Sequence, residues 1–175
     1  MSIDFVQKVK PEKKKIRELT YNVYTNGCVD EKTNNGAWAF QVIDRYERKN
    51  ILCNKVKNTT KAEMDLCSIL ESIKWIIKDT GDNTGSSTII VRKPEDISYI
   101  CINLYSTSIY CVNIIREWLD KWIIDDNFES RPNHVLLREI HQLIKQIKFS
   151  ITWSQKTANE FIWAVDRISN EKILE

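Results

Sequence analysis

Apolar and polar positions alternate over the first third of the chain. Short runs at 21–24, 37–43 and 51–57 are rich in aromatic and β-branched residues, which predicts three strands. The stretch 25–36 holds Asn, Gly, Asp and Thr, and it predicts a turn between the first two strands. The three strands are expected to form an antiparallel meander.

After this region the apolar positions recur at helical spacing. Thr60 and Glu63 have the spacing of a capping box, and a helix is predicted over about 61–78. Further helices are predicted over about 108–123, 133–147 and 158–168, with strands over about 100–105 and 149–153 and a short apolar run over 88–91. A meander followed by alternating strands and helices predicts an α/β fold, a five-stranded mixed sheet flanked by helices.

The charge of the chain is nearly balanced, with a net value of +2, and by itself does not indicate a polyanion-binding protein. Lysines concentrate near the start, so residues 1–17 are expected to be a basic leader that contacts phosphates or simply remains solvated. Residues 18–175 are expected to form a single domain, in which the Gly-containing stretch 79–99 is an insertion.

The cysteines and histidines argue against a zinc site. The five cysteines form no CxxC pair, and the chain has two histidines, His134 and His141. Reduced thiols and the lack of an apolar opening segment predict an intracellular protein, cytoplasmic or nuclear. No apolar run reaches the roughly 18 residues that a membrane span needs, so no membrane association is expected.

Six short segments, in the same order and on the expected elements, resemble motifs of type I ribonuclease H in the ribonuclease H-like superfamily. They span roughly residues 20 to 170, and they are TNGC at 25–28, TTKAEM at 59–64, LYSTS at 104–108, the pair Trp118 and Trp122, RPN at 131–133, and VDRIS at 165–169. The chain therefore resembles a divergent ribonuclease H, and the resemblance implies the ribonuclease H-like fold.

The resemblance also implies where an active site would lie. The family cleaves the RNA strand of an RNA/DNA hybrid with two divalent metal ions, which four acidic positions hold. Here Glu63 and Asp166 keep a carboxylate, whereas Asn26 and Thr107 replace the other two. The histidine that the family carries after the last strand is replaced at 156–157. Two carboxylates neutralise two divalent ions poorly, so we expect no cofactor, or one weakly bound Mg²⁺ or Mn²⁺ at Glu63 and Asp166.

Nucleic-acid contacts are expected at the start of the first long helix and in two later loops. The candidate residues are Thr59, Thr60, Lys61, Asn133 and Lys156. Small polar groups at such positions read 2′-hydroxyls and the minor groove, and lysines contact phosphates. The simpler alternatives are a solvated lysine surface and a Glu63 that only caps its helix.

Three functions follow from this pattern. The first is a ribonuclease H-like protein that has lost catalysis and still binds RNA or RNA/DNA hybrid. The second is a pseudoenzyme that serves as a scaffold for a protein partner, since fold alone does not determine function. The third is an active divalent-metal-dependent ribonuclease H with a rearranged site.

Overall fold

The computed structural model describes residues 17–82 and 96–175, which build one five-stranded sheet in the order β3-β2-β1-β4-β5. β1 (Leu19–Asp30), β2 (Asn35–Asp44) and β3 (Lys49–Val56) form the antiparallel meander. β4 (Ile100–Ser106) pairs parallel with β1, and β5 (Lys148–Trp153) pairs parallel with β4. The predicted mixed sheet of the ribonuclease H-like fold is confirmed.

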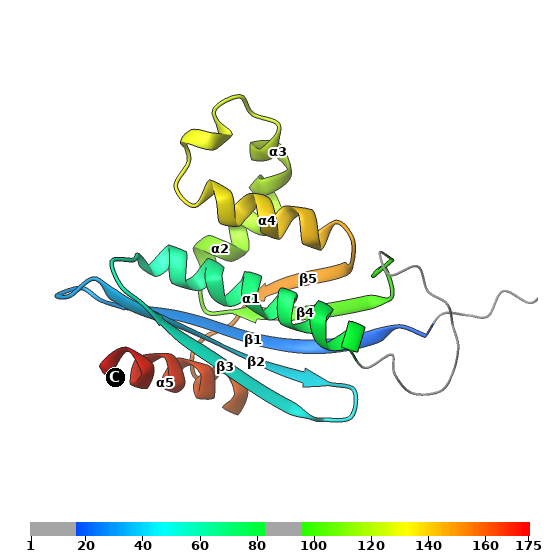
Figure 1. Cartoon of the computed structure of the whole chain (residues 1–175), viewed down its shortest axis with the longest axis horizontal. Coiled ribbons are helices and arrows are strands. Elements are labelled where there is room, and N and C mark those ends of the chain that lie inside the picture. Colours follow the sequence, from blue (N-terminus) through cyan, green and yellow to red (C-terminus); the bar gives the residue numbers. More distant parts are fainter. Residues whose placement is uncertain (1–16, 83–95) are drawn as a thin grey trace, which may run out of the picture.

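Helices cover both faces of the sheet. On one face lies α1 (Lys61–Asp82), with α4 (His134–Ile144) beside it, and α5 (Glu160–Leu174) lies on the opposite face (Figure 1). The helical segment after β4 consists of α2 (Ile109–Asn113), a π-helical turn (Ile114–Trp118) and α3 (Leu119–Ile123). A 3-10 turn (Phe128–Ser130) precedes α4.

The apolar core is divided unequally between the two faces. The larger cluster lies under α1, α2 and α4 and includes Val23, Phe40, Leu66, Ile102 and Leu104 among its fully buried members. A smaller cluster holds α5 against the meander through Tyr24, Ala39, Ile43, Ile162 and Val165. α5 is therefore held by an apolar cluster of its own, separate from the larger one.

The turn predicted over 25–36 is confined to residues 31–34, because β1 continues to Asp30 and β2 already begins at Asn35. Thr25 and Asn26 are buried within the strand, and the Thr25 hydroxyl donates to the Tyr105 carbonyl at 3.1 Å. Gly27 lies against the first turn of α1, where an added Cβ would be 2.5 Å from the backbone nitrogen of Asp65. These polar and small residues therefore fit their neighbours in a strand, although their composition is that of a turn.

Other boundaries differ less. α1 extends to Asp82 rather than 78, and the helix predicted over 108–123 contains the π-helical turn. The apolar run at 88–91, most of the predicted insertion and nearly all of the predicted leader lie outside the described residues. All five cysteines are free thiols. Within 17–82 and 96–175, no helix is long and apolar enough to cross a bilayer.

Candidate active site

Three of the four expected site positions meet where β1, β4 and α5 come together. Asn26 of β1 is 1% exposed, and its Oδ1 accepts a hydrogen bond of 2.6 Å from the Thr107 hydroxyl, just after β4. On its other side Nδ2 donates to Ser169 Oγ at 2.7 Å and to Asp166 Oδ1 at 3.3 Å, both in α5. We call Asn26, Thr107, Asp166 and Ser169 the polar cluster.

Asp166 also has a charged neighbour. The ammonium of Lys156, in the segment between β5 and α5, lies 3.2 Å from Asp166 Oδ1. The Asn170 side-chain amide donates to the same oxygen at 3.2 Å, one helical turn further along α5. The Asp166 side chain is 22% exposed, so its carboxylate is only partly open to solvent.

Glu63, the fourth position, lies in the first turn of α1. Its Oε2 accepts a 2.7 Å hydrogen bond from the Thr59 hydroxyl, and its backbone N–H donates to Thr60 Oγ1 at 3.2 Å. The second bond is one half of the predicted capping box. The same turn packs on Gly27, the residue after Asn26, which places Glu63 on the α1 side of the polar cluster.

Asp65, a buried carboxylate next to the site, was not identified by the sequence analysis. Its Oδ1 accepts the Gly27 backbone N–H at 2.8 Å, and its Oδ2 pairs with the Lys61 ammonium at 2.8 Å. Burial raises the pKa of the Asp65 carboxyl, against the opposing effect of Lys61. The signal in the sequence was the four-residue spacing of Lys61 and Asp65, which puts both on one helical face.

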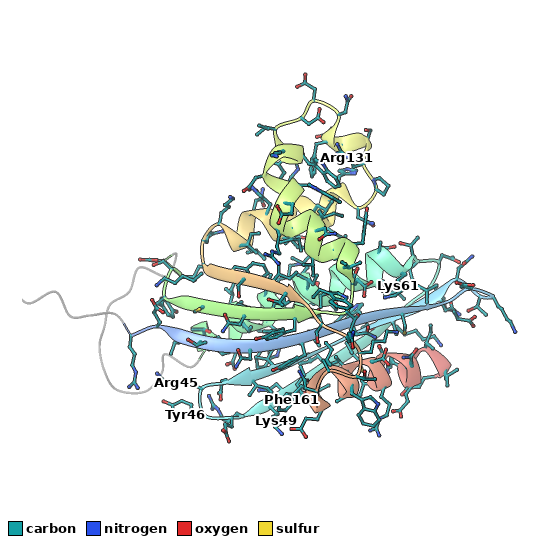
Figure 2. The ribbon with its side chains drawn as sticks, turned by 180° about the vertical axis from the view of Figure 1, so that it is seen from behind. Arg45, Tyr46, Lys49, Lys61, Arg131 and Phe161 are labelled. Atoms are coloured by element: carbon teal, nitrogen blue, oxygen red, sulfur yellow. The ribbon has the colours of Figure 1, made fainter. Side chains whose placement is uncertain are left out.

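The predicted nucleic-acid residues lie in three separate places. Thr59 is buried, Thr60 and Lys61 are exposed at the start of α1, and Lys61 also donates to the Gly27 carbonyl at 2.9 Å. Asn133 precedes α4 with a φ of 61° and makes no side-chain cap. Figure 2 shows Lys61 at the beginning of α1, with Arg131 in the outlying helical segment that also contains Asn133. Thr59, Lys61 and Lys156 thus already have partners within the protein.

The donor set of this site does not fit a pair of divalent cations. Among the residues that the structure describes, no three His, Cys, Asp or Glu side chains are grouped so as to hold a metal ion. Mg²⁺ and Mn²⁺ need several anionic oxygens at one point. Here Asn26 and Thr107 are neutral and bonded to each other, and Asp166 is paired with an ammonium.

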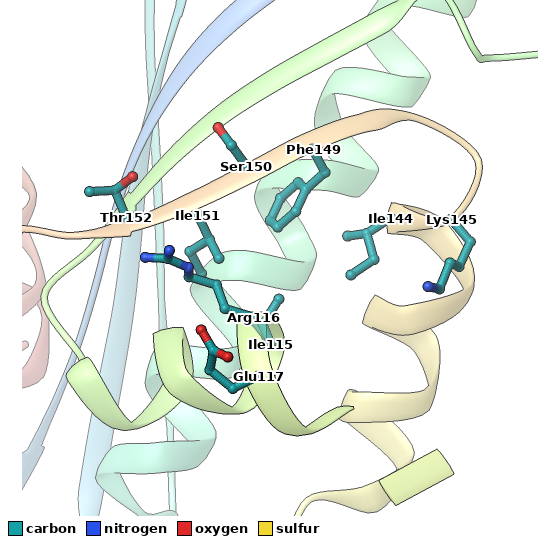
Figure 3. Close-up of a pocket in the computed structure, with 9 residues that line it drawn as sticks. All are labelled: Ile115, Arg116, Glu117, Ile144, Lys145, Phe149, Ser150, Ile151 and Thr152. Atoms are coloured by element: carbon teal, nitrogen blue, oxygen red, sulfur yellow. The ribbon is translucent and has the colours of Figure 1, made fainter. Parts of the chain in front are cut away.

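A separate groove of about 580 Å³ lies along β5, one of the two edge strands of the sheet (Figure 3). Its floor is apolar and its rim is polar, with Arg116 and Glu117 from the π-helical turn facing the strand. The polar cluster contributes no residue to this groove, whose lining is Ile115, Arg116, Glu117, Ile144, Lys145, Phe149, Ser150, Ile151 and Thr152.

Fold and site together define a ribonuclease H-like protein, and the comparisons with known proteins agree. The family model described as RNase H matches residues 18–158, so the chain belongs to the ribonuclease H family. The ribonuclease H of a Wolbachia strain from Drosophila simulans is 23% identical over 159 residues, covering 87% of this chain and 94% of that protein. That of Thermoanaerobacter sp. strain X514 is 26% identical, covering 86% and 88%.

Solved structures support the same fold at lower identity. LC9-RNase H1, described as a type 1 RNase H with the type 2 active-site motif, superposes with a TM-score of 0.67 at 16% identity, over 90% of this chain and 73% of that one. The foamy viral protease-reverse transcriptase in complex with an RNA/DNA hybrid gives a TM-score of 0.62 at 9% identity, over 98% of this chain and 22% of that one. The family match ends before α5, so the position of Asp166 rests on the fold and its contacts.

Proposed function

We propose that this ribonuclease H-like protein binds RNA or RNA/DNA hybrid without cleaving it. The observation that carries the proposal is the bonding of Asn26. This buried amide accepts from Thr107 and donates to Ser169 and Asp166, so that two of the positions where the family needs anionic metal ligands are neutral groups bonded to each other. Charge that stabilises a phosphoryl transition state is therefore missing from two of the four positions.

Cleavage is tested with end-labelled RNA/DNA hybrid in Mg²⁺ and, separately, in Mn²⁺. The expected result is that the wild-type protein produces no more RNA cleavage than an Asp166→Ala variant. Cleavage by the wild type that the Asp166→Ala or the Glu63→Ala substitution abolishes would contradict the proposal. It would instead favour an active enzyme with a rearranged site.

Binding is supported by the polar groups that remain near the start of α1 and before α4. Asn133 has a left-handed backbone conformation, which glycine adopts without strain, so Asn133→Gly removes the amide and keeps the loop. We expect hybrid affinity to fall about two- to tenfold, the effect of losing one net hydrogen bond. Fluorescence anisotropy at several salt concentrations measures this, and the wild-type affinity should weaken as salt rises.

The matched control is Asn34→Gly. Asn34 has a φ of 54° and is exposed in the turn between β1 and β2. Its backbone carbonyl accepts the Thr59 N–H at 2.9 Å, a bond that glycine retains, and its side-chain amide is not among the predicted contacts. Its replacement should leave hybrid affinity unchanged. If the wild-type protein fails to bind hybrid or RNA even at low salt, the binding half of the proposal is wrong.

A protein-binding scaffold is the second candidate. It is favoured by large apolar side chains close in sequence to Thr107 and Asp166 that remain exposed, namely Ile109, Tyr110 and Trp163. A contiguous exposed apolar patch is typical of an interaction site, and this candidate requires such a patch on α2 or on α5. A molar mass from light scattering above that of one chain, unchanged by added hybrid and reduced to one chain by Trp163→Ser, would favour this candidate.

A further inference from the structure

We infer that Lys156 is the built-in cation of this site: its ammonium supplies to Asp166 the positive charge that bound divalent ions supply in the family. The inference rests on the proposed loss of metal-dependent cleavage and adds the reason why the site is stable without metal. The contact that carries it is the 3.2 Å approach of Lys156 Nζ to Asp166 Oδ1.

Asp166 Oδ1 is surrounded by donors of this chain. The Lys156 ammonium, the Asn26 amide and the Asn170 amide approach it at 3.2, 3.3 and 3.2 Å. A carboxylate oxygen accepts only about two strong hydrogen bonds, so this one has no remaining capacity for a cation. A divalent ion at Oδ1 would have to displace one of these donors, and an ion at Oδ2 would be repelled by the nearby ammonium.

The orientation of Asn26 fits a site that contains no metal. Its Oδ1 is fixed by the Thr107 hydroxyl at 2.6 Å, so Nδ2 is the atom that faces Asp166. An aspartate at position 26 would instead place an anionic oxygen there, about 3.3 Å from Asp166 Oδ1. Two carboxylates at that distance repel unless a cation lies between them. The amide at position 26 removes this repulsion, and Lys156 neutralises the carboxylate that remains.

The backbone holds Lys156 in place over α5. The Ser154 N–H donates to the Ser106 carbonyl at 2.9 Å, which ties the start of the segment to β4. Asn159 ends the segment by capping α5, because its Oδ1 accepts the N–H groups of Phe161 and Ile162 at 3.0 Å. The segment between these two anchors is short, so the Lys156 side chain starts from a fixed point close to Asp166.

The test is a Mn²⁺ titration in which binding is measured by calorimetry and by the electron paramagnetic resonance signal of free Mn²⁺. We compare two proteins: the double variant Asn26→Asp/Thr107→Asp, and the triple variant that also carries Lys156→Met. The Lys156→Met substitution keeps the apolar stem of the side chain and removes its charge. The expected result is that Lys156→Met raises Mn²⁺ affinity about tenfold or more, the scale typical of groups next to a metal ligand. Equal affinities in the two proteins would overturn the inference.

Lys145→Met in the same background is the matched control. Lys145 is 54% exposed and pairs with Asp120 at 2.7 Å, whereas Lys156 is 53% exposed, so the two lysines differ mainly in position. The control should leave Mn²⁺ affinity unchanged. If Lys145→Met raises Mn²⁺ affinity as much as Lys156→Met does, the effect comes from the net charge of the protein alone, and the inference is contradicted.

A second measurement avoids the risk that two added carboxylates prevent folding. Mn²⁺ at millimolar concentration should broaden the amide resonances of Asp166 and Ser169 in the single variant Lys156→Met and leave them sharp in the wild type. Equal broadening in both proteins would overturn the inference. The proposed function fails in different experiments, through wild-type cleavage or an absence of hybrid binding, so the two failures are distinguishable.

Discussion

Asparagine and aspartate have nearly the same shape. At position 26 they differ in one atom, because the asparagine Nδ2 donates a hydrogen bond where an aspartate oxygen would accept one. That atom, Nδ2, contacts Ser169 Oγ at 2.7 Å, and Ser169 in turn donates to the Val165 carbonyl of its own helix. The sequence identifies Asn26 as a site position through its motif. It does not identify Ser169, because a serine three residues after Asp166 is ordinary on a helix until the strand beneath it is known.

Asp65 allows a prediction about pH. Burial raises the pKa of this carboxyl in the folded protein, so its contribution to stability is fully present below the unfolded value near 3.8 and is lost as pH rises through the folded pKa. In the Asp65→Asn variant this side chain no longer ionises, so the loss of stability with rising pH is removed. The free energy of unfolding of the variant, relative to wild type, should therefore increase between pH 3.5 and pH 7, as urea denaturation would measure.

Asp120→Asn is the control, with the opposite sign. Hydrogen bonds from Lys145 and His141 lower the pKa of the Asp120 carboxyl, so its contribution is present above about pH 3.8 and is lost as pH falls. This variant should lose stability relative to wild type as pH rises over the same range. If the free energies of unfolding of the two variants, each relative to wild type, change with pH in the same direction, the assigned environment of Asp65 is wrong.

At the scale of elements, the helical segment after β4 has an unusual period. Cys111, Ile115, Leu119 and Ile123 belong to or pack on the main core and follow one another at intervals of four residues. An α-helix has 3.6 residues per turn, so this spacing drifts around a regular helix. The π-helical turn at Ile114–Trp118 takes up the excess and leaves Trp118 40% exposed.

A π-helical turn of this kind behaves as a one-residue insertion. Deleting Glu117, which is exposed, should convert the segment into a regular α-helix with apolar intervals of four, three and four. We expect the fold to be retained and the free energy of unfolding to change by no more than about 1 kcal/mol, the range of most tolerated surface changes. Circular dichroism and urea denaturation check both.

Deleting Lys121, which is also exposed, is the contrasting variant. It removes a residue from regular α3 and turns the following residues by roughly 100° about the helix axis. Ile123, which is partly buried against the core, would then turn away from it, at a cost of up to about 3 kcal/mol, the value for a fully buried large apolar side chain. If the two deletions lower the free energy of unfolding equally, the π-helical turn is not where the helix accommodates the four-residue apolar spacing.

For the whole molecule, periodicity predicted the meander, the later alternation and the mixed sheet, because burial on one face imposes the period of each element. It failed at 25–30, where Thr25, Asn26 and Gly27 are buried for contacts with β4, α5 and α1 that no local pattern contains. The motifs placed Asn26, Thr107 and Asp166 in one site. They did not predict the pairing of Lys156 with Asp166, which depends on how the segment before α5 crosses the sheet.

The polar cluster also bears on how the chain folds. Its bonds join residues that are far apart in sequence: 81 positions separate Thr107 from Asn26, and 143 separate Asn26 from Ser169. Contacts of such long range form late, after local helices and hairpins. Since Ser169 of α5 follows Asn26 by 143 positions, ribosomal synthesis would deliver β1 with Asn26 long before this partner exists. We therefore expect the Asn26 Nδ2 of the nascent chain to be hydrogen-bonded to water until α5 has emerged.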